Sequence, residues 1–187
     1  MKFSVAIPCN LNSSRLKKKL LIEVKGTTII QRVINSAIES KISKNIYIVS
    51  DSRYLLNKIK KSKNKKLINN RKHSNATSRL TEVASKFKDN YIILLFADEI
   101  FLNKKYLRSF VNKIKKLKLK ENVVYQATCK TLTNKEIRSK NVVKCLVNSY
   151  NYIFDYKRKL KKIDNKFRLT KSIGLFCFSK KTLFLLK

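Results

Sequence analysis

Residues 91–99, YIILLFADE, show most clearly how this chain folds. An unbroken apolar run from Tyr91 to Phe96 is typical of a strand that is buried on both faces of a sheet. Asp98 and Glu99 follow after Ala97, so a pair of carboxylates comes after the end of this strand. Strands of this kind occur mostly in parallel sheets covered by helices, and we therefore expect such a sheet here.

Other apolar segments alternate between strand and helix patterns. Phe3–Pro8 and Ile46–Val49 predict strands, and residues 28–40 have helical spacing with Thr27 or Thr28 as the N-cap. Further helical patterns lie at residues 55–59, 80–87 and 107–117, and further strand-like runs at 123–129, 142–147 and 173–178. This alternation predicts an α/β fold in which a mostly parallel central sheet is flanked by helices, as one domain over residues 1–187.

Length and composition exclude several classes of protein. A chain of 187 residues can bury a substantial core, and its blocks of apolar residues argue against intrinsic disorder. No apolar run approaches the ~18 residues that a membrane-spanning helix needs. The N-terminus lacks the features of a secretory signal, so we expect a cytoplasmic protein without membrane insertion.

The net charge of +34 follows from 45 Lys and Arg against 11 Asp and Glu. Lysine far outnumbers arginine and is spread over nearly every segment, whereas a surface that reads nucleic acid favours the planar guanidinium of arginine. We therefore interpret most of the charge as a compositional bias and do not expect a nucleic acid partner. The charge can still attract small anions.

The cysteines and the one histidine are scattered along the sequence. Cys9, Cys129, Cys145 and Cys177 form no CxxC pair, which argues against a zinc site with His73. In the absence of a secretory signal we expect reduced, buried thiols, with two disulfides as the less favoured alternative.

Charged residues follow the predicted strands at their carboxyl ends. Arg15 and Lys19 lie in the loop after the first strand, Asp51 follows the second, and Asp98 follows the central one. Ligands bind beyond the carboxyl ends of parallel strands, and cations beside a carboxylate suit a metal-bound triphosphate. The alternative, that the aspartates cap helices and the lysines are solvated loop residues, stays open at this point.

Several motifs resemble one bacterial enzyme family. Residues 7–21, IPCNLNSSRLKKKLL, resemble the nucleotide-binding signature IPARxxSTRLPGKPL of the cytidylyltransferases that activate 3-deoxy-manno-octulosonate (Kdo) as its CMP sugar. Residues 73–80, HSNATSRL, are similar to the HxSGTERL of that family, and further similarities follow in order at 96–99, 141–144, 157–158 and 172–176. Pro8, Gly26 and Gly174, the only proline and glycines, fall where the family has proline and glycine.

The resemblance implies a Rossmann-like nucleotidyltransferase fold and a reaction in which CMP is joined from CTP to Kdo, with release of pyrophosphate, for lipopolysaccharide biosynthesis. Mg²⁺ is the implied cofactor and Asp98 its implied ligand, with Arg15 and Lys19 as the other catalytic residues. The nucleotide-binding residues implied by the motifs are Ser14, Arg15, Lys19 and Arg79, and the sugar-binding residues are Lys144 and Arg158. CTP, Kdo and a second copy of the chain in a homodimer are the implied partners.

The sequence also departs from the family pattern at several positions. Asn10 stands where the family has arginine, and Ala76 and Ala97 stand where it has glycine. The family continues beyond the strand at 173–178 into a segment with a second acidic metal ligand, so we expect a domain that lacks this C-terminal segment. Another sugar acid such as sialic acid, a non-enzymatic basic polyanion-binding protein, and an inactive remnant on the same scaffold stay open as alternatives.

Overall fold

The computed structural model describes all residues of the chain except 12–15, 61, 63, 131, 161–165 and 187. Its contacts divide the chain into two compact units. The first unit comprises Met1–Tyr125 and Leu175–Lys187, and the second comprises Gln126–Gly174. The strand β10 (Arg168–Ser179) begins in the second unit and ends in the first.

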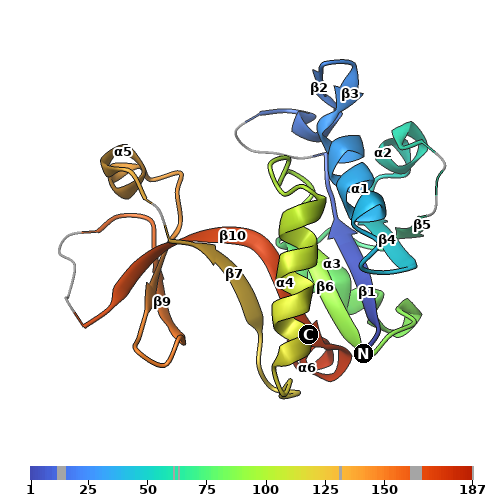
Figure 1. The fold of residues 1–187 in the computed structure, drawn as a ribbon. Coiled ribbons are helices and arrows are strands. Elements are labelled where there is room, and N and C mark those ends of the chain that lie inside the picture. The colour runs from blue at the N-terminus through green and yellow to red at the C-terminus, as the bar shows by residue number, and fades with distance from the viewer. Residues whose placement is uncertain (12–15, 61, 63, 131, 161–165, 187) are drawn as a thin grey trace. The chain divides into compact units, whose positions relative to one another are not determined.

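The first unit is built on a mostly parallel sheet (Figure 1). Its central strand β1 (Phe3–Pro8) lies between β4 (Asn45–Ser50) and β6 (Tyr91–Leu95) and runs parallel to both. β5 (Lys65–Ile68) extends the parallel set beyond β4, and Leu175–Ser179 of β10 pair with β6 in the antiparallel direction. The predicted α/β fold with a mostly parallel sheet is confirmed, including the burial of the strand at residues 91–95.

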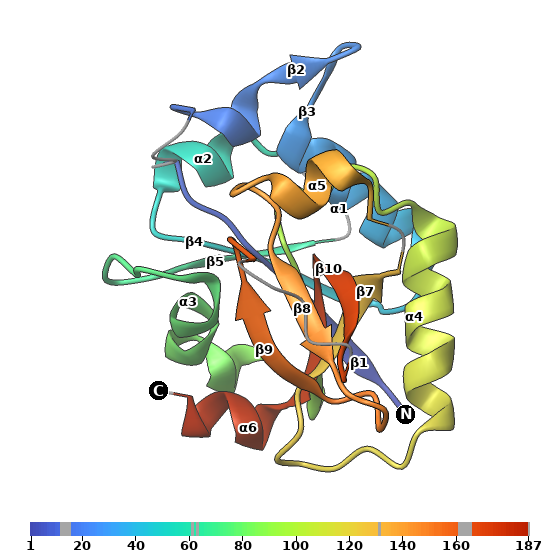
Figure 2. The same ribbon diagram turned by 90° about the vertical axis from the view of Figure 1, so that its left-hand side faces the viewer.

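Helices cover both faces of this sheet (Figure 2). α1 (Ile29–Ser40) and α4 (Lys104–Lys116) contact each other on one face. α3 (Ala76–Glu82), the 3₁₀ helix η2 (Ala84–Lys86) and α6 (Lys180–Leu185) cover the other. The predicted helix over residues 80–87 is therefore two short helices, separated at Val83, which ends α3.

Polar side chains begin most of these helices. The Thr28 hydroxyl accepts a hydrogen bond from the Gln31 backbone N–H, which confirms Thr28 as the N-cap of α1. The same type of cap begins the other α-helices of this unit, including α2 (Arg53–Lys58), through Ser52, Asn75, Asn103 and Ser179.

The core follows the alternation of the strands. One buried cluster is formed by side chains of the sheet together with side chains of the helices α3, η2 and α6 and the residues next to them. It consists of Ala6, Tyr47, Val49, Leu80, Val83, Ala84, Phe87, Ile92, Leu94, Phe178 and Leu183. Phe178 belongs to this cluster, and Phe176 packs against it while partly buried. Full burial of one Val, Leu, Ile or Phe side chain of this cluster stabilises the fold by about 1.5–3 kcal/mol.

A short hairpin projects between β1 and α1. β2 (Glu23–Val24) and β3 (Thr27–Thr28) are joined by Lys25 and Gly26, both with positive φ, at 49° and 70°. Two-residue hairpin turns of this kind favour glycine, which explains why one of the two glycines of the chain lies here.

The second unit is antiparallel. β8 (Lys144–Val147) pairs with β9 (Ile153–Lys157) on one side and with the first part of β10 on the other, and β7 (Tyr125–Cys129) also pairs with β10. The short helix α5 (Asn134–Arg138) lies between β7 and β8 in the chain. No helix in the described part of the chain is long and apolar enough to cross a membrane.

Candidate functional site

The carboxyl ends of β1 and β6 border a cavity of about 340 Å³ in the first unit. These strands are parallel neighbours, so the residues that follow them come out at the same edge of the sheet. The cavity is lined by Pro8, Cys9, Asn10, Leu16, Lys19, Leu20, Ala76, Phe96, Ala97 and Asp98. It thus lies at the edge of the sheet where the charge pattern predicts a ligand site.

Lys19 and Asp98 form the charged pair of this cavity. Lys19 begins the 3₁₀ helix η1 (Lys19–Leu21), and its Nζ lies 2.7 Å from Oδ2 of Asp98. The side chains are 38% and 41% exposed, so an anionic ligand can reach the ammonium and a cation the carboxylate. The structure therefore brings together two of the predicted site residues. Ser14 and Arg15, predicted for the same loop, lie outside the described residues.

Cys9 forms an inert part of the cavity wall. Burial raises the pKa of the Cys9 thiol to about 12, despite smaller opposing effects of a hydrogen bond with Ser50 and the charge of Arg79. The Sγ atom lies 3.5 Å from the carbonyl oxygen of Val49. A protonated thiol is not a nucleophile, which fits the interpretation of Cys9 as a small buried side chain. Cys145 and Cys177 are buried as Cys9 is, whereas Cys129 is partly exposed.

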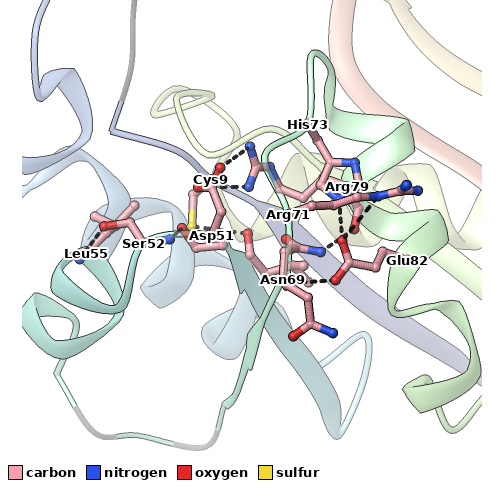
Figure 3. Close-up of polar contacts among 12 residues, drawn as sticks. Cys9, Asp51, Ser52, Leu55, Asn69, Arg71, His73, Arg79 and Glu82 are labelled. Atoms are coloured by element: carbon pink, nitrogen blue, oxygen red, sulfur yellow. Dashed lines mark hydrogen bonds and ion pairs between the residues drawn. The ribbon is translucent and has the colours of Figure 1, made fainter.

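Arg79 is buried and forms an ion pair with the partly exposed Asp51 (Figure 3). Its Nη1 lies 3.0 Å from Oδ1 of Asp51 and its Nη2 lies 3.3 Å from Oδ2, while only 3% of the Arg79 side chain is exposed. The pair joins α3 to the end of β4, and Asn69 donates a hydrogen bond to the Arg79 carbonyl oxygen. Arg79 does not line the cavity, but Ala76 on the preceding turn of α3 does.

A family model described as cytidylyltransferase matches residues 5–182 of this chain. The chain belongs to the cytidylyltransferase family. The 3-deoxy-manno-octulosonate cytidylyltransferase of Wigglesworthia glossinidia brevipalpis is 34% identical over 163 residues, which are 86% of this chain and 65% of the relative. The protein of the same name from Flavobacterium johnsoniae is 23% identical over 188 residues, covering 98% of this chain and 77% of the relative. This chain thus spans slightly less than two thirds of the Wigglesworthia relative.

Solved structures support the same fold for this member of the cytidylyltransferase family. A CMP:2-keto-3-deoxy-manno-octonic acid synthetase complexed with CTP matches with a TM-score of 0.78 and 21% identity, covering 98% of this chain and 76% of the other. The 4-diphosphocytidyl-2C-methyl-D-erythritol synthase of Anaerococcus prevotii matches with a TM-score of 0.61 and 14% identity, covering 99% and 73%. The nucleotidyltransferase fold implied by the motifs is therefore confirmed.

His73 holds the segment before α3 in place. Its Nε2 lies 2.5 Å from Oε2 of Glu82, and the Asn70 backbone N–H donates to Oε1 of the same carboxylate at 2.6 Å. Burial of Glu82 raises its pKa, but these hydrogen bonds outweigh burial and hold the pKa of this carboxyl below its usual range. Figure 3 shows His73 and Glu82 near the ion pair of Arg79 and Asp51. Sequence reasoning did not single out Glu82, although its position one helical turn after Arg79 places both on one side of α3.

Lys144 and Arg158, the predicted sugar-binding residues, contact each other within the second unit. Lys144 is fully buried, and its Nζ donates hydrogen bonds of 2.6 Å to the carbonyl oxygens of Ser139 and Arg158. Burial and the nearby charge of Arg158 lower the pKa of Lys144. The Arg158 side chain is exposed, and its Nη1 donates to the Lys140 carbonyl oxygen at 3.2 Å. Lys144 therefore fixes the backbone that carries Arg158.

The described residues contain no group of three or more His, Cys, Asp or Glu side chains arranged to hold a metal ion. Among the described residues that line the cavity, Asp98 is the one that carries a carboxylate. Mg²⁺ is commonly held by one or two carboxylates together with the phosphates of a substrate. The half-exposed oxygens of Asp98 fit a Mg²⁺ ion of that kind, with Lys19 beside it for the phosphates.

Proposed function

We propose that this protein joins CMP from CTP to Kdo and releases pyrophosphate. The observation that carries this proposal is the Lys19–Asp98 pair in a cavity at the carboxyl ends of β1 and β6, in a chain of the cytidylyltransferase family. The choice of CTP and Kdo as substrates rests on the relatives named 3-deoxy-manno-octulosonate cytidylyltransferase. The family match supports an enzyme over a non-enzymatic polyanion-binding protein.

The chemistry needs a site that offsets the charge of a triphosphate. The anomeric hydroxyl of Kdo attacks the α-phosphorus of CTP, a new phosphorus–oxygen bond forms, and the bond to pyrophosphate breaks. In the proposed mechanism the Lys19 ammonium neutralises charge on the phosphate oxygens as the leaving group departs. Ser14 and Arg15 are proposed to extend this cradle along the same loop.

Asp98 is the proposed holder of Mg²⁺, which supplies Lewis-acid stabilisation of phosphate charge when bound. Lys19, at 2.7 Å, keeps the Asp98 carboxylate pointed into the cavity before the nucleotide arrives. A pair in which both partners are about 40% exposed is held weakly, so the two groups can separate to take phosphate and cation.

The remaining predicted residues have proposed roles that follow from their contacts. Arg79 is proposed to serve the nucleotide site by fixing α3, whose first residue Ala76 lines the cavity. Arg158 is proposed to bind the carboxylate of the sugar acid, with Lys144 holding its backbone in position. We further propose a cytoplasmic homodimer whose product enters lipopolysaccharide biosynthesis.

The test is pyrophosphate release from CTP and Mg²⁺ with Kdo or with sialic acid as acceptor. We expect release with Kdo, and at least a hundredfold loss in Asp98→Asn. Glu39→Gln is the matched control, because it also removes one exposed carboxylate but lies on α1, outside the cavity. Turnover with sialic acid but not with Kdo would refute Kdo as the acceptor substrate. Full activity of Asp98→Asn would refute the proposed role of Asp98 in the site.

A further inference from the structure

One face of α4 forms a second depression, of about 490 Å³, in the first unit. All six residues that line it belong to this helix and are exposed, and we call them the α4 surface: Lys105, Arg108, Ser109, Asn112, Lys113 and Lys116. From residue 104 to residue 120 the chain has eight lysines and arginines and no acidic residue. The α4 surface is therefore strongly cationic and takes no part in the proposed nucleotide cavity.

The α4 surface faces away from the core because of the helical period. Leu107, Val111 and Ile114 are buried and hold α4 on the unit, and at 100° per residue they lie opposite Lys105 and Lys116. Tyr106 is 60% exposed and lies on the same stripe as Lys113, seven residues later. The lysines of the α4 surface are thus bordered by an exposed aromatic ring.

The cations that remain available on the α4 surface are lysines. The Arg108 guanidinium is engaged with the end of α1, donating through Nε to the Ser40 carbonyl oxygen at 2.9 Å and through Nη2 to that of Glu39 at 3.1 Å. Without a free guanidinium fork the surface lacks the usual group for bidentate recognition of bases. Ammonium groups on flexible stems beside an exposed aromatic ring suit the diffuse charge of a lipid headgroup layer.

We propose that the α4 surface docks this protein peripherally on an anionic lipid bilayer. Lysines close to an anionic membrane each strengthen binding by about fivefold, and several on one face act together. Tyr106 would lie at the level of the headgroups, where aromatic rings are favoured. This proposal does not rest on the proposed function, because the α4 surface shares no residue with the nucleotide cavity.

Vesicle cosedimentation tests the proposal with the full chain. We expect binding to phosphatidylcholine vesicles that contain phosphatidylglycerol, no binding to phosphatidylcholine alone, and loss of binding at high salt. The triple variant Lys105→Gln, Lys113→Gln and Lys116→Gln should bind about a hundredfold more weakly. The matched control changes three exposed lysines outside α4 and loses the same charge, through substitution to Gln at Lys72, Lys86 and Lys88.

The control separates a docking surface from a general effect of net charge. Equal loss of vesicle binding in both triple variants would overturn the proposal, as would the absence of binding in the parent protein. Pyrophosphate release and thermal unfolding should be unchanged in the α4 variant, which shows that it is folded. Binding of duplex nucleic acid that depends on the α4 lysines, without vesicle binding, would also overturn the proposal.

A fluorescent reporter tests the orientation of the protein on the bilayer. The chain has no tryptophan, so Tyr106→Trp introduces a single indole at the border of the α4 surface. Its emission should shift to shorter wavelength when anionic vesicles are added. Tyr54→Trp is the control, because Tyr54 is 51% exposed and lies on α2. A shift in the control alone would contradict docking through α4.

Discussion

Removal of Asp51 should destabilise the protein more than removal of its partner Arg79. The two side chains form one ion pair but differ in exposure, at 21% for Asp51 and 3% for Arg79. Asp51→Ala leaves a buried guanidinium without its carboxylate, and breaking a buried pair in this way costs about 3–5 kcal/mol. We expect about 3 kcal/mol, the lower end, because one side of the pair is within reach of water.

Arg79→Met keeps the aliphatic stem and leaves a carboxylate that water can solvate, so we expect a smaller loss, about 1–2 kcal/mol. The double variant should lose less than the sum of the two single losses, because neither charge is then left alone. The free energies of unfolding are measured in urea, which does not screen charges, by circular dichroism. Equal losses in the single variants, or additive losses in the double variant, would refute this account of the pair.

Three shorter predictions concern other sites. Lys19→Met should change the free energy of unfolding by less than about 1 kcal/mol, because the ion pair of Lys19 is exposed, but should lower kcat/KM at least a hundredfold. A loss of unfolding free energy as large as the loss of transition-state stabilisation would contradict the proposed role of Lys19. The pKa of Glu82 is lowered in the folded protein, so its contribution to stability is present at neutral pH and is lost as the pH falls below 4.5. The parent protein should therefore be more stable than Glu82→Gln at neutral pH, and this difference should shrink below pH 4.5. Urea titrations at several pH values measure the difference. A thiol reagent should modify Cys129 first in the native protein, and rapid modification of a buried cysteine would contradict the fold.

The strands and helices that were predictable from the sequence are those with strong local patterns. The apolar run at 91–96 and the Thr28 cap are both confirmed because burial on two faces and helix capping act over a few residues. β5 was missed inside a polar stretch, because it is an edge strand of which only Leu67 and Ile68 are apolar. Lys66 in this strand is half-buried, and its Nζ donates to carbonyl oxygens at the end of α2.

β9 was missed for a related reason. It is the last strand in the sheet order, and its aromatic residues Phe154 and Tyr156 are 71% and 50% exposed, so its alternation of apolar and polar residues does not mark a buried face. An edge strand needs a neighbour on one side only, and its pattern is correspondingly weak.

The proximity of Lys19 and Asp98 was predictable because the carboxyl ends of parallel strands meet at one edge. The pair of Arg79 with Asp51 was not, since the motif alone suggested a nucleotide contact for Arg79. The burial of Lys144 could not be predicted either, because it depends on carbonyl groups that two other loops supply.

The most direct test of the central claim is the shift in Tm caused by CTP and Mg²⁺. If Lys19 and Asp98 hold the triphosphate and its cation, CTP at a hundred times its Kd should raise Tm by roughly 5–10 °C in the parent protein. The shift should require Mg²⁺ and should disappear in Asp98→Asn but not in Glu39→Gln. A Tm that does not respond to CTP, or that responds equally in all three proteins, would contradict the claim.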